Sequence, residues 1–324
     1  MLIGIDIGGT KVAAAVVDGV EVRHRVERPT ELASASALLD SVAEIAREVA
    51  RSAGREPVVV GAGVPSQIDA ATGTALASVN IPFAGVPLRA ELGNRLGVPV
   101  FVDNDANCAA LGEAQLAPDP PARDLAMLTL GTGVGGGLVI GGRVFHGATG
   151  LGGELGHMVV DGRAADDAPR GAFPRPGSLE WHCSGRGLER EATRAAAESP
   201  GSALSRLRDA TGRVSGRDAV AAARDGDGPA TAVLERFGRW LGIGVATVVN
   251  AFEPQRVVVG GGISQAAELF LETARAEAAR WALPALWERT TLALARGGPD
   301  AGLIGAAVLA AQELEDSGHT AGGT

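Results

Sequence analysis

The stretch LIGIDIGGTKVAAAVVD, residues 2–18, decides the expected fold because it returns in outline as LAMLTLGTGVGGGLVIG, residues 125–141. Each copy has an apolar run, a glycine-rich turn that contains a threonine, and a second apolar run, which predicts a β-hairpin. Glycines allow the backbone N–H groups of such a turn to approach phosphate oxygens closely, and Thr10 and Thr132 add hydroxyl donors. Two such turns, one in each half of a duplicated fold, predict a phosphate clamp.

Asp6 lies two residues before the Gly8-Gly9 pair, on a strand that is otherwise apolar. A carboxylate in such a strand is costly unless something compensates its charge. We therefore expect Asp6 to hold Mg²⁺, directly or through water, beside the phosphates that Thr10 and Lys11 approach. The alternative is an aspartate that accepts hydrogen bonds from the N–H groups of the turn.

The composition limits the classes of protein and partner. A chain of 324 residues with 46% hydrophobic residues can bury two cores. The net charge of −9 and the lack of a Lys/Arg-rich run argue against nucleic acid or an anionic membrane as partner. Cys108 and Cys183 are too few for a disulfide framework, and no leader or membrane-spanning stretch is apparent. We expect a soluble, cytoplasmic protein.

The first half of the chain has apolar patterns that predict the order β-β-β-α-β-α-β. Such an order is typical of an α/β fold in which helices pack on a mixed sheet. Besides the hairpin, the expected segments are a strand at 20–26, a helix at 31–53, a strand at 57–64, a turn region at 65–73, a loop at 80–83, a helix at 88–96, a strand at 98–102 and a helix at 108–115.

The run of Pro and Asp at 118–121 is the clearest linker, because such residues neither continue a helix nor pair in a sheet. We place the domain boundary there. The predicted domains are residues 1–117, joined by a C-terminal helix at 302–316, and residues 118–301. In the second domain we expect a glycine-rich loop at 141–156, a proline-rich excursion at 163–177, helices at 187–197, 218–224 and 230–252, and a strand at 256–259.

Asp105 is the strongest candidate for a catalytic group. It follows Asn104 at the carboxyl end of a predicted buried strand and precedes a helix, which is where α/β sheets present ligand-binding groups. A carboxylate there can accept the proton of an attacking hydroxyl. The alternative role is that of a helix N-cap, which we expect one of Asp103, Asp105 and Asn107 to fill.

Glu154, His157 and Glu180 form a second set of candidates, in the motifs GGELGH and GSLE. Carboxylates and imidazoles hold adjacent hydroxyl groups by accepting and donating hydrogen bonds, so this set suits a polyol. Taken alone, a Glu and a His in a loop are more often solvated. The presence of Asn104 and Asp105 in the same chain favours the binding role.

Six motifs, in this order and over nearly the whole chain, resemble the ROK family of sugar kinases. They are DIGGTK (6–11), GVP (63–65) with Asn80 downstream, VDNDANCAALGE (102–113), LGTGVGGG (130–137), GGELGH (152–157) and PQRVVVGGGIS (254–264). The resemblance implies a duplicated actin-like, ribonuclease-H-like fold with a cleft between two domains. It also implies transfer of phosphate from ATP to a sugar hydroxyl, with glucose as the default acceptor.

The resemblance implies a role for each matching residue. Asp105 is the implied catalytic base, and with it the residues around the sugar are Asn80, Asn104, Glu154, His157 and Glu180. The implied phosphate contacts are Gly8, Gly9, Thr10, Lys11, Thr132 and Gly133, with Gly260, Gly261 and Gly262 near adenosine. We expect ATP with Mg²⁺ at Asp6, a sugar or sugar-like acceptor as the other small-molecule partner, and a homodimer.

The sequence departs from the family at one place. Members usually carry a zinc site made by the His of the GH pair and three cysteines, and here the cysteine positions hold Gly171, Phe173 and Ser178. A tetrahedral zinc site does not survive the loss of three of its four ligands, so we expect no structural zinc. A different site made by His157 with His182 and Cys183 has no spacing signature in its favour.

The sequence leaves alternative functions, acceptors and phosphate donors open. The family also contains repressors with an added helix-turn-helix segment, for which a first strand at residue 2 leaves no room, and a non-catalytic sugar sensor would have little use for Asp6, Lys11 and Asp105 together. Alternative acceptors are N-acetylhexosamines, mannose, fructose and a glucose-like C7-cyclitol. Polyphosphate is the alternative donor.

Overall fold

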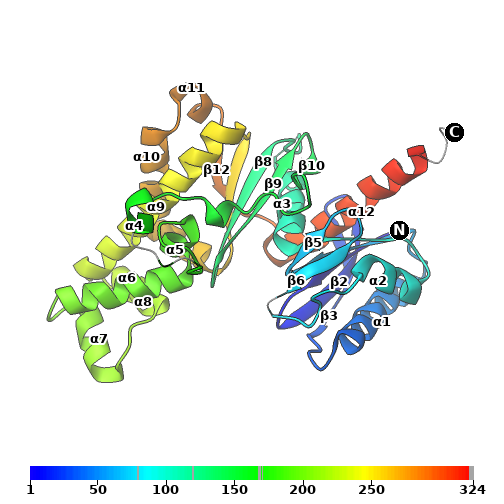
Figure 1. Ribbon diagram of the computed structural model, residues 1–324, viewed down its shortest axis with the longest axis horizontal. Coiled ribbons are helices and arrows are strands. Elements are labelled where there is room, and N and C mark those ends of the chain that lie inside the picture. The colour runs from blue at the N-terminus through cyan, green and yellow to red at the C-terminus, as the bar shows by residue number, and fades with distance from the viewer. Residues whose placement is uncertain (79, 119, 167–168, 170, 321–324) are drawn as a thin grey trace. The chain divides into compact units, whose positions relative to one another are not determined.

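A computed structural model of the protein describes residues 1–78, 80–118, 120–166, 169 and 171–320 (Figure 1). The chain forms two compact α/β units. The first unit comprises Met1–Met127, Gly137–Gly153 and Ala295–Thr324, and the second comprises Leu128–Gly136 and Glu154–Leu294. The division predicted between residues 117 and 118 stays a prediction, and Asp119 of its linker lies outside the described residues.

The first sheet has five strands in the order β3-β2-β1-β4-β7. Strand β1 pairs antiparallel with β2 and parallel with β4, β3 pairs antiparallel with β2, and β7 pairs parallel with β4. The sheet is therefore mixed, as predicted. The strands are β1 (Leu2–Ile7), β2 (Lys11–Asp18), β3 (Glu21–Pro29), β4 (Val59–Val64) and β7 (Val100–Asn104).

The second sheet repeats the topology of the first. Its order is β10-β9-β8-β11-β12, which in chain order is third, second, first, fourth and fifth, as in the first sheet. The duplication inferred from the two glycine-turn segments is confirmed at the level of strand order. The strands are β8 (Leu125–Leu130), β9 (Val134–Ile140), β10 (Arg143–Val144), β11 (Arg256–Gly260) and β12 (Thr291–Leu294).

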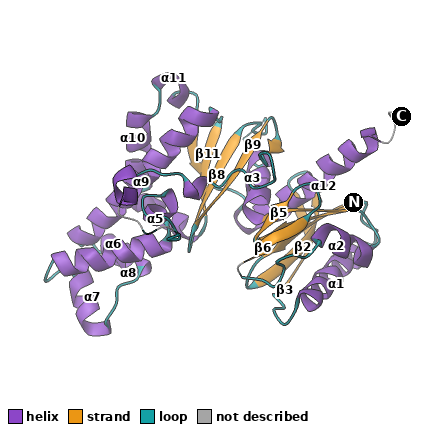
Figure 2. Ribbon diagram, in the orientation of Figure 1, coloured by secondary structure: helices purple, strands orange, loops and turns teal. Residues whose placement is uncertain are grey.

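The predicted hairpin at residues 2–18 forms with Leu2 opposite Val17 and Ile7 opposite Val12. Alternate residues of β1 bury their side chains in a core shared with helices α1 (Ala35–Ala53) and α2 (Leu88–Leu96), which lie along one side of this sheet (Figure 2). This period of two is what allows a short apolar sequence to build a sheet face.

The other face of β1 and β4 is covered by α12 (Ala301–Thr320), which also packs on α3 (Asp105–Gln115). The helix lies so close that a Cβ on Gly4 would overlap the carbonyl group of Leu303, and one on Gly61 would overlap that of Ala306. Glycine is required at both strand positions because no side chain fits between the strands and the helix.

Helix boundaries follow the capping residues. The helix predicted at 31–53 begins at Ala35, because the Ser34 hydroxyl accepts a hydrogen bond from Ala37 N and so caps it. The helix predicted at 108–115 begins earlier, at Asp105. Its cap is Asn104, whose Oδ1 accepts hydrogen bonds from Ala106 N and Asn107 N. The expectation that Asp103, Asp105 or Asn107 would be the cap was therefore wrong.

The region predicted as a turn at 65–73 contains more order than expected. Strands β5 (Ser66–Asp69) and β6 (Thr74–Ser78) form an antiparallel pair. The turn between them contains Gly73 at φ 68°, a backbone conformation that favours glycine. A strand of four residues and one of five give too little periodicity to be found by pattern alone.

The second unit carries most of the helices. Helices α6, α7 and α8 pack on one another as a group without strands (Figure 2). Helices α6, α8 and α9 were predicted to within about two residues at each end, whereas α5, α7 and α10 were not predicted. The helices are α4 (Gly162–Asp166), α5 (Leu179–Cys183), α6 (Gly185–Glu198), α7 (Ala203–Thr211), α8 (Gly216–Arg224), α9 (Gly228–Phe252), α10 (Leu271–Trp281) and α11 (Pro284–Trp287).

The residues that the structure describes also include the 3₁₀ helices η1 (Leu155–His157), η2 (Gly262–Leu269) and η3 (Gly298–Asp300). Within the described part of the chain, no helix is both long and apolar enough to cross a membrane.

Candidate active site

The turn between β1 and β2 is held from both sides. Gly8 N donates to the carbonyl of Lys11 at 2.8 Å, and the hydroxyl of Thr30 donates to the carbonyl of Gly8 at 2.7 Å. A Cβ on Gly9 would lie 3.2 Å from the Cβ of Asn80. The structure therefore brings together the predicted phosphate turn and Asn80. Thr30 was not predicted as part of the site, because no sequence motif marks it.

Lys11 has an anionic partner in this state of the protein. Its Nζ lies 3.1 Å from Oε2 of Glu27, and the side chains of both residues are about half exposed. Arg25 also donates to Glu27. These hydrogen bonds, that from Lys11 first, hold the pKa of Glu27 below its usual range. A phosphate bound at the turn would compete with Glu27 for Lys11.

Asp6 lies on β1 beside α12, and a Cβ on Gly302 would be 3.1 Å from its Cγ. Burial, followed by the negative charge of Asp105, raises the pKa of Asp6 to about 6. Lys11 and Arg25 oppose this shift. A divalent cation would relieve both the burial of the carboxylate and its repulsion from Asp105, so these residues fit a magnesium ion.

Asn104 and Asp105 form the junction between β7 and α3. Both polar atoms of the Asn104 side-chain amide are hydrogen-bonded, because Oδ1 caps the helix and Nδ2 donates to the carbonyl of Ser66 at 3.2 Å. Oδ1 of Asp105 accepts a hydrogen bond from Ala106 N at 2.9 Å. Burial raises the pKa of Asp105, which increases its affinity for a proton. This property suits a group that has to accept one.

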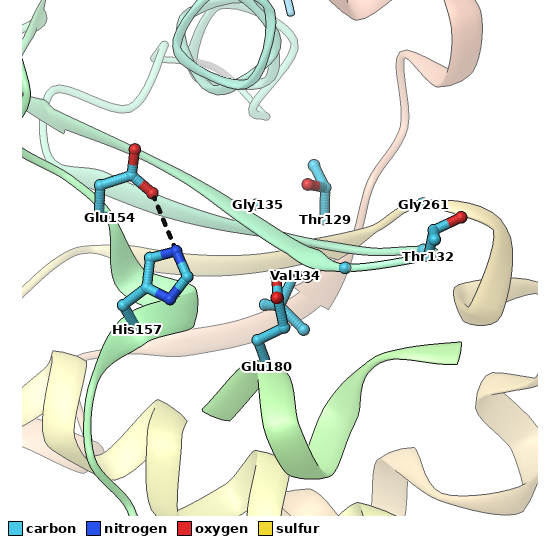
Figure 3. Close-up of a pocket in the computed structure, with 10 residues that line it drawn as sticks. Thr129, Thr132, Val134, Gly135, Glu154, His157, Glu180 and Gly261 are labelled. Atoms are coloured by element: carbon cyan, nitrogen blue, oxygen red, sulfur yellow. Dashed lines mark hydrogen bonds and ion pairs between the residues drawn. The ribbon is translucent and has the colours of Figure 1, made fainter. Parts of the chain in front are cut away.

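A pocket of about 340 Å³ lies within the second unit (Figure 3). Predicted sugar residues and predicted phosphate residues line it together, whereas Gly260 and Gly262 are not part of its lining. Oε2 of Glu154 is 3.7 Å from Nε2 of His157. The lining residues are Thr129, Gly131, Thr132, Gly133, Val134, Gly135, Glu154, His157, Glu180 and Gly261.

Glu180 connects helix α5 to the turn between β8 and β9. Its Oε2 accepts a hydrogen bond from Val134 N at 2.8 Å. Helix α5 is capped by Ser178, whose hydroxyl accepts from Trp181 N at 3.1 Å. The cap places Glu180 in the first turn of the helix, where a negative charge is favourable.

Backbone hydrogen bonds hold together the chain on both sides of the proline-rich segment. Leu179 N donates to the carbonyl of Met158 at 2.9 Å, and Val160 N and Asp161 N both donate to the carbonyl of Gly177, at 2.8 and 3.0 Å. The segment predicted at 163–177 is thus closed at its base, while residues 167, 168 and 170 lie outside the described residues. These bonds join the part of the chain that carries His157 to the part that carries Glu180.

The residues at the family's cysteine positions do not fit a zinc ion. Ser178 is buried and serves as a helix cap. The ring of Phe173 packs 5.1 Å from that of His157, and Gly171 has no side chain to offer. His182 stacks on Trp240 at 4.1 Å, and Cys183 is buried. Among the residues that the structure describes, no group of three or more His, Cys, Asp and Glu side chains is arranged to hold a metal.

The candidate residues fall into both units. The first unit holds Asp6, Gly8, Gly9, Thr10, Lys11, Asn80, Asn104 and Asp105, and the second holds Thr132, Gly133, Glu154, His157, Glu180, Gly260, Gly261 and Gly262.

Comparisons with known proteins agree with the fold. The sequence pattern of the ROK family matches residues 2–313. The glucokinase of Streptomyces coelicolor is 37% identical over 319 residues, which cover 96% of this chain and 97% of the relative. The crystal structure of the ROK hexokinase from Thermus thermophilus shares 36% identity with a TM-score of 0.82, and covers 97% of this chain and 99% of its own.

A second solved structure contains bound ligands. The ROK family glucokinase from Streptomyces griseus, in complex with glucose and AMPPNP, is 33% identical with a TM-score of 0.74, and the match covers 96% of this chain and 99% of that chain. The family match at residues 2–313 spans both halves of the duplicated fold and all six sequence motifs. The chain belongs to the ROK family.

Proposed function

We propose that this protein is an ATP-dependent sugar kinase that transfers a phosphoryl group to a hydroxyl of a hexose, with glucose at its 6-hydroxyl as the first candidate. The observation that carries the proposal is Asp105, a carboxylate of raised pKa at the start of α3, in a chain of the ROK family. Glucokinases of this family are similar over nearly the whole chain.

In the proposed reaction Asp105 takes the proton from the acceptor hydroxyl as the hydroxyl oxygen attacks the γ-phosphorus, and the bond between the γ-phosphorus and the β,γ-bridging oxygen breaks to release ADP. Asn104 and Asn80 orient the sugar from the first unit, and Glu154, His157 and Glu180 do so from the second. Asp105 belongs to the first unit and these three residues belong to the second. Because the base meets the hydroxyl only when the sugar is held, sugar binding also provides a means of excluding water.

The glycine-rich turns are the proposed phosphate contacts. Backbone N–H groups at Gly9 and Gly133 and the hydroxyls of Thr10 and Thr132 are donors of the type that phosphate oxygens accept. The N–H of Gly8 is bonded to the carbonyl of Lys11, so Gly8 is proposed to shape the turn beside the phosphates. Lys11 would exchange its contact with Glu27 for one with phosphate. Gly260, Gly261 and Gly262 follow β11 and are proposed to lie near adenosine.

Magnesium is proposed to accompany ATP, with Asp6 as the protein group that holds it. Bound there, the ion would supply positive charge to the phosphates. What the chain itself provides is a partly buried carboxylate whose pKa of about 6 still leaves it ionised, and so able to bind a cation, at neutral pH. Structural zinc is not proposed, because Gly171, Phe173 and Ser178 cannot ligate it.

The proposed alternative acceptors are N-acetylhexosamines, mannose, fructose and a glucose-like C7-cyclitol. The ring of Phe173 packs 5.1 Å from that of His157, a residue proposed to bind the sugar, at a position where the family usually has a zinc-binding cysteine. We further propose that the protein acts in the cytoplasm as a homodimer. Its net charge of −9 argues against nucleic-acid and anionic-membrane partners.

The test is a panel assay with these acceptors, using ATP with Mg²⁺ and separately polyphosphate, and NMR of the product to locate the new phosphate ester. We expect transfer from ATP to one acceptor of the panel at least, and none by Asp105→Asn. Folded parent protein that phosphorylates nothing on the panel would contradict the proposed function.

The proline-rich segment can be tested separately. We expect it to influence acceptor choice, so a variant that carries cysteines at Gly171, Phe173 and Ser178 should change the ratio of kcat/KM for glucose to that for the other acceptors. An unchanged ratio would mean that this segment does not control specificity.

A further inference from the structure

Asp103 is a buried carboxylate next to the candidate site that has no part in the proposed chemistry. It lies on β7, is 3% exposed and accepts three hydrogen bonds. Oδ1 accepts from Asn104 N at 2.7 Å and from Asn107 Nδ2 at 2.9 Å, and Oδ2 lies 2.6 Å from Nε2 of His146. A carboxylate buried this deeply is costly without such partners.

His146 reaches Asp103 from a distant part of the sequence. It follows β10, in the glycine-rich segment at 141–156 that was predicted only as a loop. The backbone there is fixed, because Phe145 N donates to the carbonyl of Leu138 at 2.7 Å and Gly152 N donates to that of His146 at 2.9 Å. The hydrogen bond to Asp103 raises the pKa of His146. Both residues belong to the first unit.

The partners of Asp103 surround the proposed base. Asn104 precedes Asp105 and caps α3, and Asn107 lies in the first turn of the same helix. The Asp103 carboxylate accepts from the backbone N–H of Asn104 and from the side-chain amide of Asn107. It therefore fixes the chain on both sides of Asp105. A charge-assisted hydrogen bond from His146 fixes that carboxylate in turn.

We propose that Asp103 and His146 are positioning residues, which set the orientation of Asp105. His146 holds the chain that follows β10 against the β7–α3 junction, within the first unit. The inference rests on the proposed function, because positioning matters here only if Asp105 is the base.

An ordinary structural role predicts a different outcome. A buried ion pair that served stability alone would change the fraction of folded protein, and its loss would leave the kinetic constants of the folded fraction unaltered. Misplacement of a catalytic group by about 1 Å can lower the rate by about a hundredfold. The constants must therefore be measured per folded enzyme.

The variants are His146→Ala, His146→Gln and Asp103→Asn. For His146→Ala we expect kcat to fall by about tenfold to a hundredfold, the KM for sugar to rise and the KM for ATP to stay the same. Gln should restore much of the activity, because its amide nitrogen can occupy the position of Nε2 and donate to Oδ2. Asp103→Asn should lower kcat more than His146→Gln, since an amide cannot accept from all three donors.

Arg143→Ala is the matched control. Arg143 lies on β10 close in sequence to His146, and its Nη1 is 2.8 Å from Oδ2 of Asp316 on α12. Both side chains of this ion pair are exposed, and neither belongs to the β7–α3 junction. Removal of an exposed pair changes stability by about 1 kcal/mol or less, so the kinetic constants should match those of the parent.

The outcomes separate the two proposals. An inactive parent refutes the proposed function and the positioning role with it. An active parent whose constants are unchanged in folded His146→Ala refutes the positioning role alone. If His146→Ala does not fold, His146→Gln is compared with His146→Asn, whose shorter amide cannot reach Oδ2. Equal activity of these two would overturn the inference, and faster amide hydrogen exchange at Asn104 to Asn107 in the Asn variant would support it.

Discussion

Oε2 of Glu180 accepts a hydrogen bond of 2.8 Å from the backbone N–H of Val134, so helix α5 holds the turn that carries Thr132 and Gly133. One carboxylate thereby lines the pocket and supports a proposed phosphate contact. A Cβ on Gly133 would lie only 2.5 Å from the same Oε2.

Gly133→Ala should therefore displace Glu180. We expect the KM for the sugar to rise together with the KM for ATP, since the methyl group pushes the carboxylate from its place and disturbs the turn. Steady-state kinetics with each substrate varied in turn would measure both. Gly162→Ala is the control, because a Cβ there meets nothing within 4 Å. A rise in the KM for ATP alone would show that Glu180 does not depend on this turn.

Asp105→Asn should lose phosphoryl transfer and keep most of its affinity for sugar. The amide can still form hydrogen bonds but cannot accept the proton, and base catalysis contributes about 10²- to 10⁴-fold. Turnover is measured by a coupled assay and affinity by calorimetry. The raised pKa of Asp105 also predicts that the parent loses activity on acidification at a pH above the ordinary range of aspartate. Turnover by Asp105→Asn within a few-fold of the parent value would show that Asp105 is not the catalytic base.

Asp6→Asn should stabilise the free protein at pH 8 while it removes activity. The pKa of Asp6 rises from 3.8 to about 6 on folding, so the folded state binds the proton more tightly than the unfolded state. Ionised Asp6 consequently lowers the free energy of unfolding above pH 6, by at most about 3 kcal/mol.

This cost declines as the pH falls through 6 towards 3.8, and the advantage of the Asn variant should decline with it. Melting temperatures without Mg²⁺ and ATP at pH 8 and pH 4.5 would reveal the trend. Asp18→Asn, at the exposed end of β2, is the control. A variant less stable than the parent at pH 8 would show that Asp6 has stabilising partners instead of an uncompensated charge.

The purified protein should contain no stoichiometric zinc, and its activity should survive chelation once Mg²⁺ is returned. Hydrogen bonds between 158–161 and 177–179 close the segment that a metal would otherwise hold, and Ser178 already caps α5. Elemental analysis measures the metal content. One tightly bound zinc per chain would contradict this and would direct attention to His157, His182 and Cys183.

His182→Phe should make the protein more resistant to acid. Burial lowers the pKa of His182 to about 4 from 6.5, so the unfolded state takes up the proton first and stability is lost as the pH falls from 6.5 to 4. The loss is at most about 3 kcal/mol. Phe retains a ring to stack on Trp240 and cannot be protonated. Urea denaturation at pH 7.5 and pH 5 would test this, and equal losses in parent and variant would refute it.

Much of the fold followed from local pattern. The two apolar runs on either side of the glycine-rich turn at 2–18 predicted the β1–β2 hairpin, and the proposed duplication at 125–141 matches the repeated strand order. Helix α2 began and ended as predicted, because its apolar spacing and its C-cap residue Gly97 are both local features of the sequence. The β5–β6 pair and α5 were missed, because elements of four or five residues depend on contacts that lie outside their own sequence.

The sequence by itself determined the α/β class, the two glycine-rich turns and the identity of the residues that carry the family resemblance, since motif and periodicity are properties of neighbouring residues. Tertiary structure decided which residues contact one another and how strongly the buried titratable groups bind a proton. The contact of Gly9 with Asn80, the bond from Val134 to Glu180 and the pair of Asp103 with His146 each join residues far apart in the chain. The raised pKa of Asp6 likewise comes from burial and from Asp105. Such effects depend on distance through space and on exclusion of water, and neither is encoded in the local order of residues.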